Sequence, residues 1–218
     1  MRYADAFQIQ SDLAAERKQG RGVDHLLFVE HPHVVTIGRN GHERNILSRA
    51  GMEVYESDRG GDVTYHGPGQ IVGYPIIDLR EWKRDVGAYV RAIEQVLIDT
   101  LACYDISAHR IPGMTGVWTV APAVEAASGS TQTDAKIAAI GVHLSRWVST
   151  HGWALNVNTE LRYFQSIVPC GLTKPVTSMQ ALGVHADPEE VKLILAHHFG
   201  KIFDFEMQAE PAMETVLV

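Results

Sequence analysis

Residues 59–74 read Arg-Gly-Gly-Asp-Val-Thr-Tyr-His-Gly-Pro-Gly-Gln-Ile-Val-Gly-Tyr, with five glycines, one proline, one histidine and two tyrosines in a single run. Glycine lets the main chain approach a ligand closely or adopt a positive φ, and Pro68 stiffens the bend between Gly67 and Gly69. We therefore expect this stretch to form one rigid wall of a binding site. The alternative is a structural role, in which two tight turns flank a short Val-Thr-Tyr strand.

The composition of the 218-residue chain is that of an ordinary globular protein, with 45% hydrophobic and 21% charged residues. No apolar run is long enough to cross a bilayer, and residues 1–20 lack the hydrophobic stretch of a signal peptide. We therefore expect a cytoplasmic protein with no membrane partner. The formal net charge of -7 argues against general nucleic-acid binding, which requires a cationic face.

One segment ahead of the glycine-rich run is positive within this acidic chain. Residues 39–49 contain Arg39, Arg44 and Arg49 against Glu43 alone. Such a run is usually a solvated face of the protein. Its functional interpretation is a docking surface for an acidic partner.

The cysteines and histidines do not indicate a metal site. Cys103 and Cys170 are 67 positions apart, and the eleven histidines are scattered along the chain. These spacings match none that zinc sites use, so we expect no metal and no cofactor. Cys103 follows an apolar helical face, and we expect it to be a buried packing residue.

The apolar periodicity predicts a mixture of helices and strands. We expect helices over 3–19, 85–101 and 161–164, and a fourth from Asp187 through Phe199. We expect strands over 26–29, 34–37, 52–55, 70–79, 106–110, 115–120, 136–148, 152–157 and 201–207. This order predicts an α+β fold with a mainly antiparallel or mixed sheet.

Three local features refine this prediction. The strands 26–29 and 34–37 are expected to flank a turn, and the strands 136–148 and 152–157 to meet near His151. Pro75 suggests that its strand lies at a sheet edge or contains a bulge. Residues 121–135 lack periodicity and are expected to form a mobile surface loop.

Cys170 is the candidate nucleophile. It lies between Pro169 and Gly171, outside any regular pattern, whereas a packing cysteine usually lies inside an element. Lys136 opens a strand of small apolar residues, and its ammonium would favour a thiolate if it pointed toward Cys170. The alternative is that Lys136 is only the exposed first residue of its strand. His66, His143 and His151 are competing candidates for activating the thiol.

Several blocks of sequence occur together in an order that is highly specific. The run from Arg59 to Gln70 is followed by Tyr74-Pro75, Asp78-Leu79, Gly116-Val117-Trp118, Lys136-Ile-Ala-Ala-Ile-Gly141, His151-Gly-Trp-Ala-Leu-Asn156 and Pro169-Cys170-Gly171, and preceded by Glu30-His31-Pro32 and Thr36-Ile37-Gly38-Arg39. Over about residues 3–200, the chain thereby resembles the octanoyltransferases of lipoate biosynthesis.

This resemblance implies the fold of the biotin and lipoate protein ligases, in a single catalytic domain over 1–218 with its core at about 25–205. It implies transfer of an octanoyl group from octanoyl-acyl carrier protein to a lysine on lipoyl domains of 2-oxoacid dehydrogenases or on the glycine cleavage H protein. It assigns Cys170 and Lys136 as the catalytic pair, with a thioester acyl-enzyme at Cys170. It implies that the substrate is lined by Arg59, Gly60, Gly61, Asp62, Val63, Thr64, Tyr65, His66, Ala139, Ile140, Gly141, Gly152, Trp153 and Ala154.

Two other functions remain open from the sequence. One is an ATP-dependent lipoate or biotin ligase of the same fold, which would form an acyl-adenylate and would not require a nucleophilic cysteine. The other is a non-catalytic module that binds the carrier or the lipoyl domain. For such a module a glycine-rich groove suffices, and Cys170 would be replaceable.

Overall fold

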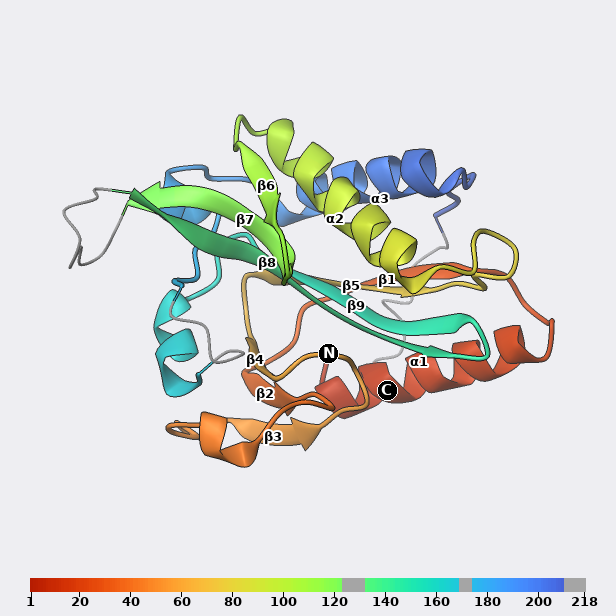
Figure 1. The fold of residues 1–218 in the computed structure, drawn as a ribbon, viewed down its shortest axis with the longest axis horizontal. Coiled ribbons are helices and arrows are strands. Elements are labelled where there is room, and N and C mark those ends of the chain that lie inside the picture. Colours follow the sequence, from red (N-terminus) through yellow and green to blue (C-terminus); the bar gives the residue numbers. More distant parts are fainter. Residues whose placement is uncertain (123–131, 169–173, 210–218) are drawn as a thin grey trace.

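A computed structural model describes residues 1–122, 132–168 and 174–209 of the chain (Figure 1). The helices are α1 (Tyr3–Lys18), α2 (Val86–Ala102) and α3 (Pro188–Phe203), with short 3-10 helices η1 (Glu43–Asn45), η2 (Leu161–Ser166) and η4 (Gln180–Leu182). The strands are β1 (His25–Val29), β2 (Val34–Ile37), β3 (Glu53–Glu56), β4 (Val63–His66), β5 (Gln70–Ile76), β6 (Ala108–Ile111), β7 (Met114–Pro122), β8 (Gln132–Ser145) and β9 (Val148–Asn156).

The strands form two sheets. The larger sheet has six strands in the order β1-β5-β9-β8-β7-β6, and each neighbouring pair is antiparallel. The smaller sheet has the order β3-β2-β4, in which β2 pairs with β3 in parallel and with β4 antiparallel. The predicted α+β fold with a mixed, mainly antiparallel arrangement is confirmed.

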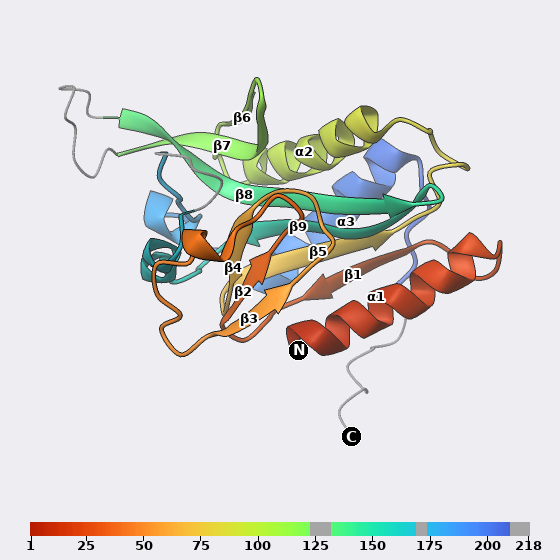
Figure 2. The same ribbon diagram turned by 60° about the horizontal axis from the view of Figure 1, so that its bottom comes forward.

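The large sheet separates two layers (Figures 1 and 2). Helices α2 and α3 cover one of its faces and form the main hydrophobic core with it. Helix α1 packs on the opposite face against β5 and β9, and the small sheet lies beside α1 on that side. The glycine-rich run supplies β4 and the start of β5, so it connects the two sheets.

The long helices begin where their sequences predict. The side chain of Asp85 accepts a hydrogen bond from the Ala88 N–H at the start of α2, and Asp187 accepts one from the Glu189 N–H at the start of α3. The predicted strand over 201–207 is wrong, because α3 continues to Phe203. That ring stacks on Phe199 in the core, so packing favours another helical turn. No helix among the described residues is long and apolar enough to cross a membrane.

The predicted strands 26–29 and 34–37 are present as β1 and β2 on either side of residues 30–33, and β1 joins the large sheet whereas β2 joins the small one. The expectation of an edge position for Pro75 is wrong. Pro75 is not at an edge, because β5 lies between β1 and β9. The β5–β9 ladder instead stops at Gly73↔Trp153, two residues before the proline that has no N–H to donate.

The β8–β9 hairpin turns at Arg146 and Trp147, which have φ of 52° and 67°. Two positive φ values define a type I′ turn, which usually contains Asn-Gly, so these residues gave no turn signal. His151 therefore lies inside β9 and not at the junction of two strands. The predicted loop over 121–135 is too long, since β7 extends to Pro122 and β8 starts at Gln132; residues 123–131 are outside the described part of the chain.

Candidate functional site

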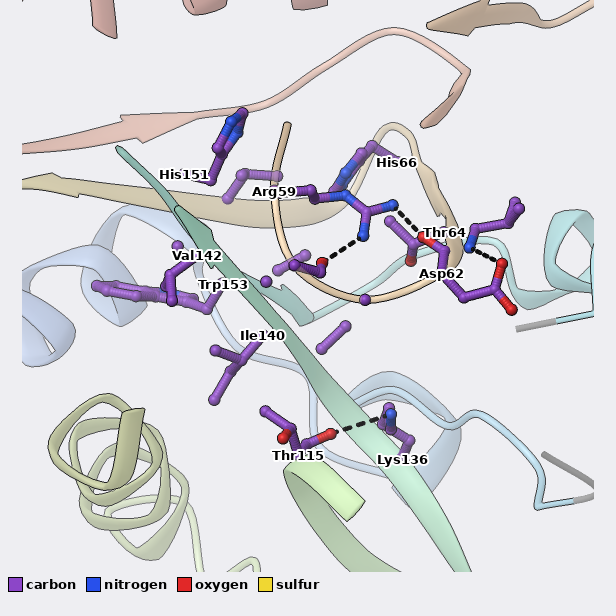
Figure 3. A pocket seen from close by; sticks show the side chains of 18 of the residues that line it. Arg59, Asp62, Thr64, His66, Thr115, Lys136, Ile140, Val142, His151 and Trp153 are labelled. Atoms are coloured by element: carbon purple, nitrogen blue, oxygen red, sulfur yellow. Dashed lines mark hydrogen bonds between the residues drawn. The ribbon is translucent and has the colours of Figure 1, made fainter. Parts of the chain in front are cut away.

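A cavity of about 430 Å³ lies between the glycine-rich run and strands β8 and β9. Fourteen residues were predicted to surround the substrate, and thirteen of them line this cavity. Lys136 lines it as well. The structure therefore brings together three blocks that are far apart in sequence: 59–66, 139–141 and 152–154 (Figure 3). Cys170 lies outside the described residues.

Arg59 holds the loop that covers the cavity. Its side chain is buried, with 7% of its surface exposed. The guanidinium donates hydrogen bonds to the carbonyl oxygens of Thr36 and Asp62 at 2.8 and 2.7 Å, and to that of Gly60 at 3.0 Å. Because a buried guanidinium is stable only with its donors satisfied, these bonds fix the loop to the small sheet.

The same loop is fastened to the large sheet. The Gly60 N–H donates to the Val142 carbonyl oxygen at 2.9 Å. A Cβ atom on Gly141 would lie 2.8 Å from the Gly60 carbonyl oxygen, closer than side chains pack. Glycine at position 141 thus permits the loop to lie directly on β8.

Lys136 is fixed at the wall of the cavity. Its Nζ donates to the Thr115 carbonyl oxygen at 3.2 Å (Figure 3) and lies 4.7 Å from the ring centroid of Trp118. Its backbone N–H donates to the Pro175 carbonyl, and its carbonyl accepts from the Thr177 N–H. Lys136 is thereby bonded directly to the chain that follows Cys170.

The family follows from comparison with known sequences. Residues 2–200 match the sequence profile of the lipoyl protein ligase A/B catalytic domain. The chain belongs to this family. Within it, an octanoyltransferase of Solibacter usitatus is 63% identical over 94% of this chain and 90% of its own length. An octanoyltransferase of Koribacter versatilis is 50% identical over 92% of this chain and 80% of its own.

A solved structure shows the fold that the family shares. The bipartite lipoate protein ligase of Thermoplasma acidophilum covers 94% of this chain and 83% of its own, with a TM-score of 0.69. Its sequence is only 15% identical, so this likeness concerns the fold alone. The predicted biotin and lipoate ligase fold is confirmed.

A directed chain of hydrogen bonds runs along the wall of the cavity in this family member. The Asn156 side-chain amide donates to the Thr177 carbonyl, and its Oδ1 accepts from Nε2 of Gln70. The Gln70 Oε1 must then accept from the Nδ1–H of His66, 2.8 Å away. Burial lowers the pKa of His66 to about 3, so its ring is neutral and its Nε2 is a hydrogen-bond acceptor.

Asp58 joins the two other histidines that were candidates for activating the thiol. Its carboxylate lies 2.7 Å from Nε2 of His151 and 3.4 Å from Nε2 of His143. Burial lowers the pKa of both histidines. Burial also acts to raise the pKa of Asp58, but the hydrogen bond from His151 and the charges nearby lower it overall. The described polar partner of His143 and His151 is thus the Asp58 carboxylate, whereas that of His66 is the Gln70 side-chain amide.

Tyr65 is the predicted lining residue that does not line the cavity. Successive side chains of a strand point to opposite faces, and Tyr65 lies between Thr64 and His66, which both line it. Its hydroxyl is 2.8 Å from Nδ1 of His33, and its ring packs on Tyr163. Tyr65 therefore anchors the small sheet.

Some lining residues were missed from the sequence. Gln70 and Asn156 end two of the blocks that carry the resemblance, so their position there was a usable signal. Tyr3, from α1, and Val90, from α2, also line the cavity, and nothing in their sequence context indicated a site.

Cys103 differs from the expectation for it. It is exposed at the end of α2, with its Sγ 3.5 Å from Nε2 of His198. The helical face ends at Leu101, so the chain turns away from the core before Cys103. Within the described ranges, no group of three His, Cys, Asp or Glu side chains is placed to hold a metal ion.

Proposed function

We propose that this protein transfers an octanoyl group from octanoyl-acyl carrier protein to a specific lysine of lipoyl domains. The observation that carries the proposal is the 63% identity to a named octanoyltransferase over nearly the whole of both chains. The cavity supports it, because the predicted lining blocks meet there around small side chains such as Ala139, Gly141 and Ala154. We take 1–218 as one catalytic domain.

In the first half-reaction, the Cys170 thiolate attacks the thioester carbon of the donor. A new sulfur–carbon bond forms at Cys170, the carbon–sulfur bond to the carrier breaks, and the carrier's thiolate leaves as a thiol with the proton that the Lys136 ammonium donates, so Lys136 becomes neutral. Exchange of one thioester for another is nearly isoenergetic, so no ATP is required. Lys136 favours this step because its ammonium stabilises the thiolate.

In the second half-reaction, the neutral amine of the acceptor lysine attacks the octanoyl-enzyme. A nitrogen–carbon bond forms, the bond to the Cys170 sulfur breaks, and the amide product leaves. Lys136, no longer paired with a thiolate, accepts the proton that the amine loses. Formation of an amide from a thioester is downhill and drives the cycle.

The described chain on either side of 169–173 supports this pairing of Lys136 and Cys170. On one side, the Val168 N–H donates to the Asn45 carbonyl, and the Asn45 side chain donates to Asp62 of the cavity wall. On the other side, Lys174 pairs with Asp134 on β8 at 2.9 Å. The chain before 169–173 is thus linked through Asn45 to a residue of the cavity wall, and the chain after it is paired with β8, which also carries Lys136.

The positive segment supports an acidic carrier as the donor. Arg39, Arg44 and Arg49 are exposed, and Arg49 pairs with Glu43 on the surface. Leu47 N–H and Ser48 N–H both donate to the Ser166 carbonyl, so this segment runs beside the chain that leads to Cys170.

A reactive thiol must stay reduced, and we therefore place the reaction in the cytoplasm.

A turnover experiment tests the proposal and separates it from its rivals. The protein is mixed with octanoyl-acyl carrier protein and an unmodified lipoyl domain, and the mass of the lipoyl domain is recorded. We expect octanoylation of its lysine without ATP. A mass that shifts only with free octanoate and ATP would identify a ligase, and a lipoyl domain unmodified under both conditions would leave only a binding module.

A further inference from the structure

The pairing of β7 with β8 opens beside Lys136. The ladder runs from Pro122↔Gln132 to Val117↔Ala138 and stops there. Continued at the same register, it would place Thr115 opposite Ile140, but no such pair forms. Both residues line the cavity instead, so the cavity occupies the opening between the two strands.

The backbone of Ile140 faces this opening. In an antiparallel strand, the N–H and C=O of one residue point to the same side, and alternate residues point the same way. The Val142 carbonyl points away from β9, because it accepts from the Gly60 N–H. Ile140 is two residues earlier in an unbroken register, so its N–H and C=O point to that side as well.

The Lys136 side chain makes the hydrogen bond to Thr115 that a continued ladder would supply. The Thr115 carbonyl, which would accept from the Ile140 N–H in a continued ladder, accepts from Lys136 Nζ instead (Figure 3). Gly116 makes the opening possible: its φ is +125°, and a Cβ there would lie 2.8 Å from the Ala138 carbonyl oxygen. Its N–H turns to Glu94 on α2.

An acyl chain alone does not suit this edge. Ile140 has no partner on β7. Among the described residues, no backbone hydrogen bond outside the sheets involves Ile140 either. Apolar methylenes packed against a backbone N–H would leave that donor unsatisfied, which is unfavourable in a buried site. The group that fits is a polar oxygen next to the lysine.

We propose that the Ile140 N–H binds the carbonyl oxygen of the acyl group and stabilises its negative charge during transfer. The proposal rests on the acyl transfer proposed above. When the nucleophile adds to the carbonyl carbon, the π electrons move to the oxygen, which accepts the hydrogen bond. When the C=O bond forms again, a thiolate is expelled, that of the carrier in the first half-reaction and that of Cys170 in the second, and the oxygen returns to neutral.

Replacement of Ile140 by its α-hydroxy acid tests this role, because the backbone amide becomes an ester, in which an oxygen replaces the N–H and the side chain is unchanged; the weaker ester carbonyl is matched in the control below. We expect the rate of octanoyl transfer from the donor to fall by about 10²–10³-fold, as for the loss of other oxyanion donors. The matched control is the same replacement at Leu144, whose backbone has the same orientation on β8 and which does not line the cavity. The control should keep the wild-type rate.

A binding measurement makes the test independent of turnover. A ketone analogue of octanoyl-pantetheine, in which CH₂ replaces the sulfur, cannot transfer its acyl group. Its ¹³C-labelled carbonyl should shift to lower infrared frequency on binding to the wild type and the Leu144 ester, and not to the Ile140 ester. An equal shift with all three proteins overturns the proposal even if transfer is observed. A wild-type shift that the Ile140 ester abolishes supports it even if octanoyl transfer fails.

Discussion

The ammonium of Lys136 donates a hydrogen bond to the Thr115 carbonyl oxygen, and this bond holds the lysine across the opening between β7 and β8. This bond keeps the ammonium at the wall of the cavity. Its effect on Cys170 can be measured without any substrate.

Lys136→Ala should slow alkylation of Cys170 by iodoacetamide at neutral pH. If the lysine lowers the thiol pKa by about two units, its loss reduces the thiolate fraction at pH 7 by more than about tenfold. The experiment uses a Cys103→Ser background, because Cys103 is exposed and would also react. Lys192→Ala on α3 is the control, and an equal rate for both variants would remove the activating role of Lys136.

Gly141→Ala should destabilise the protein and impair octanoyl transfer, because the new methyl group would push Gly60 away from β8. Overpacking of this kind costs about 1–3 kcal/mol in the free energy of unfolding. Gly87→Ala, in the first turn of α2, is the control, since its new methyl group would meet the flexible end of Arg91 and, at an ordinary contact distance of 3.4 Å, the Asp85 carboxylate. Urea unfolding of both variants measures the difference, and equal midpoints would contradict the close packing of loop and strand.

The unfolding free energy should fall with acidification, partly through His31. Burial lowers the pKa of His31 to about 4, whereas an unfolded histidine titrates near 6.5. The native state therefore binds fewer protons between these values, and stability is lost as the pH falls from about 6.5 to 4, by about 1.4 kcal/mol per pH unit for one such group.

His31→Gln should remove that part of the slope while leaving a constant offset above about pH 7.5. Denaturant unfolding at several pH values gives both curves. Parallel curves between pH 6.5 and 4 would show that His31 does not remain neutral in the folded protein.

Arg44→Glu should weaken binding of the acidic carrier, and the difference from wild type should shrink at high salt. Arg21→Glu is the control, because residue 21 follows the C-terminal end of α1, which lies away from the small sheet (Figure 1). Titration of the carrier at low and high ionic strength measures the effect. Equal losses at both positions would indicate that net charge, and not a docking surface, sets the affinity.

The sequence predicted the elements whose apolar spacing is regular. Helix α2 places Tyr89, Ile93 and Leu97 on one buried face, so its periodicity alone located it. The end of α3 could not be located in this way, because Ile202 and Phe203 fit a strand as well as a helix and only packing on Phe199 decides between them. The β8–β9 turn was missed because Arg146 and Trp147 are not typical turn residues.

The lining of the site was predicted better than its internal contacts. The blocks carrying the family resemblance supplied all fourteen predicted lining residues, and thirteen of them line the cavity, because alternation along β4 turns only Tyr65 away. The link from Asp58 to His151 spans 93 positions, and the bond from Lys136 to Thr115 depends on where a ladder opens. Neither leaves a pattern in local sequence.

The central claim is the covalent acyl-enzyme at Cys170. Intact-mass measurement after mixing the protein with octanoyl-acyl carrier protein, in the absence of ATP, tests it most directly. We expect an octanoyl adduct on the wild type and on Cys103→Ser, and none on Cys170→Ala. An adduct that persists in Cys170→Ala, or no adduct on a wild type that still modifies lipoyl domains, would contradict the account.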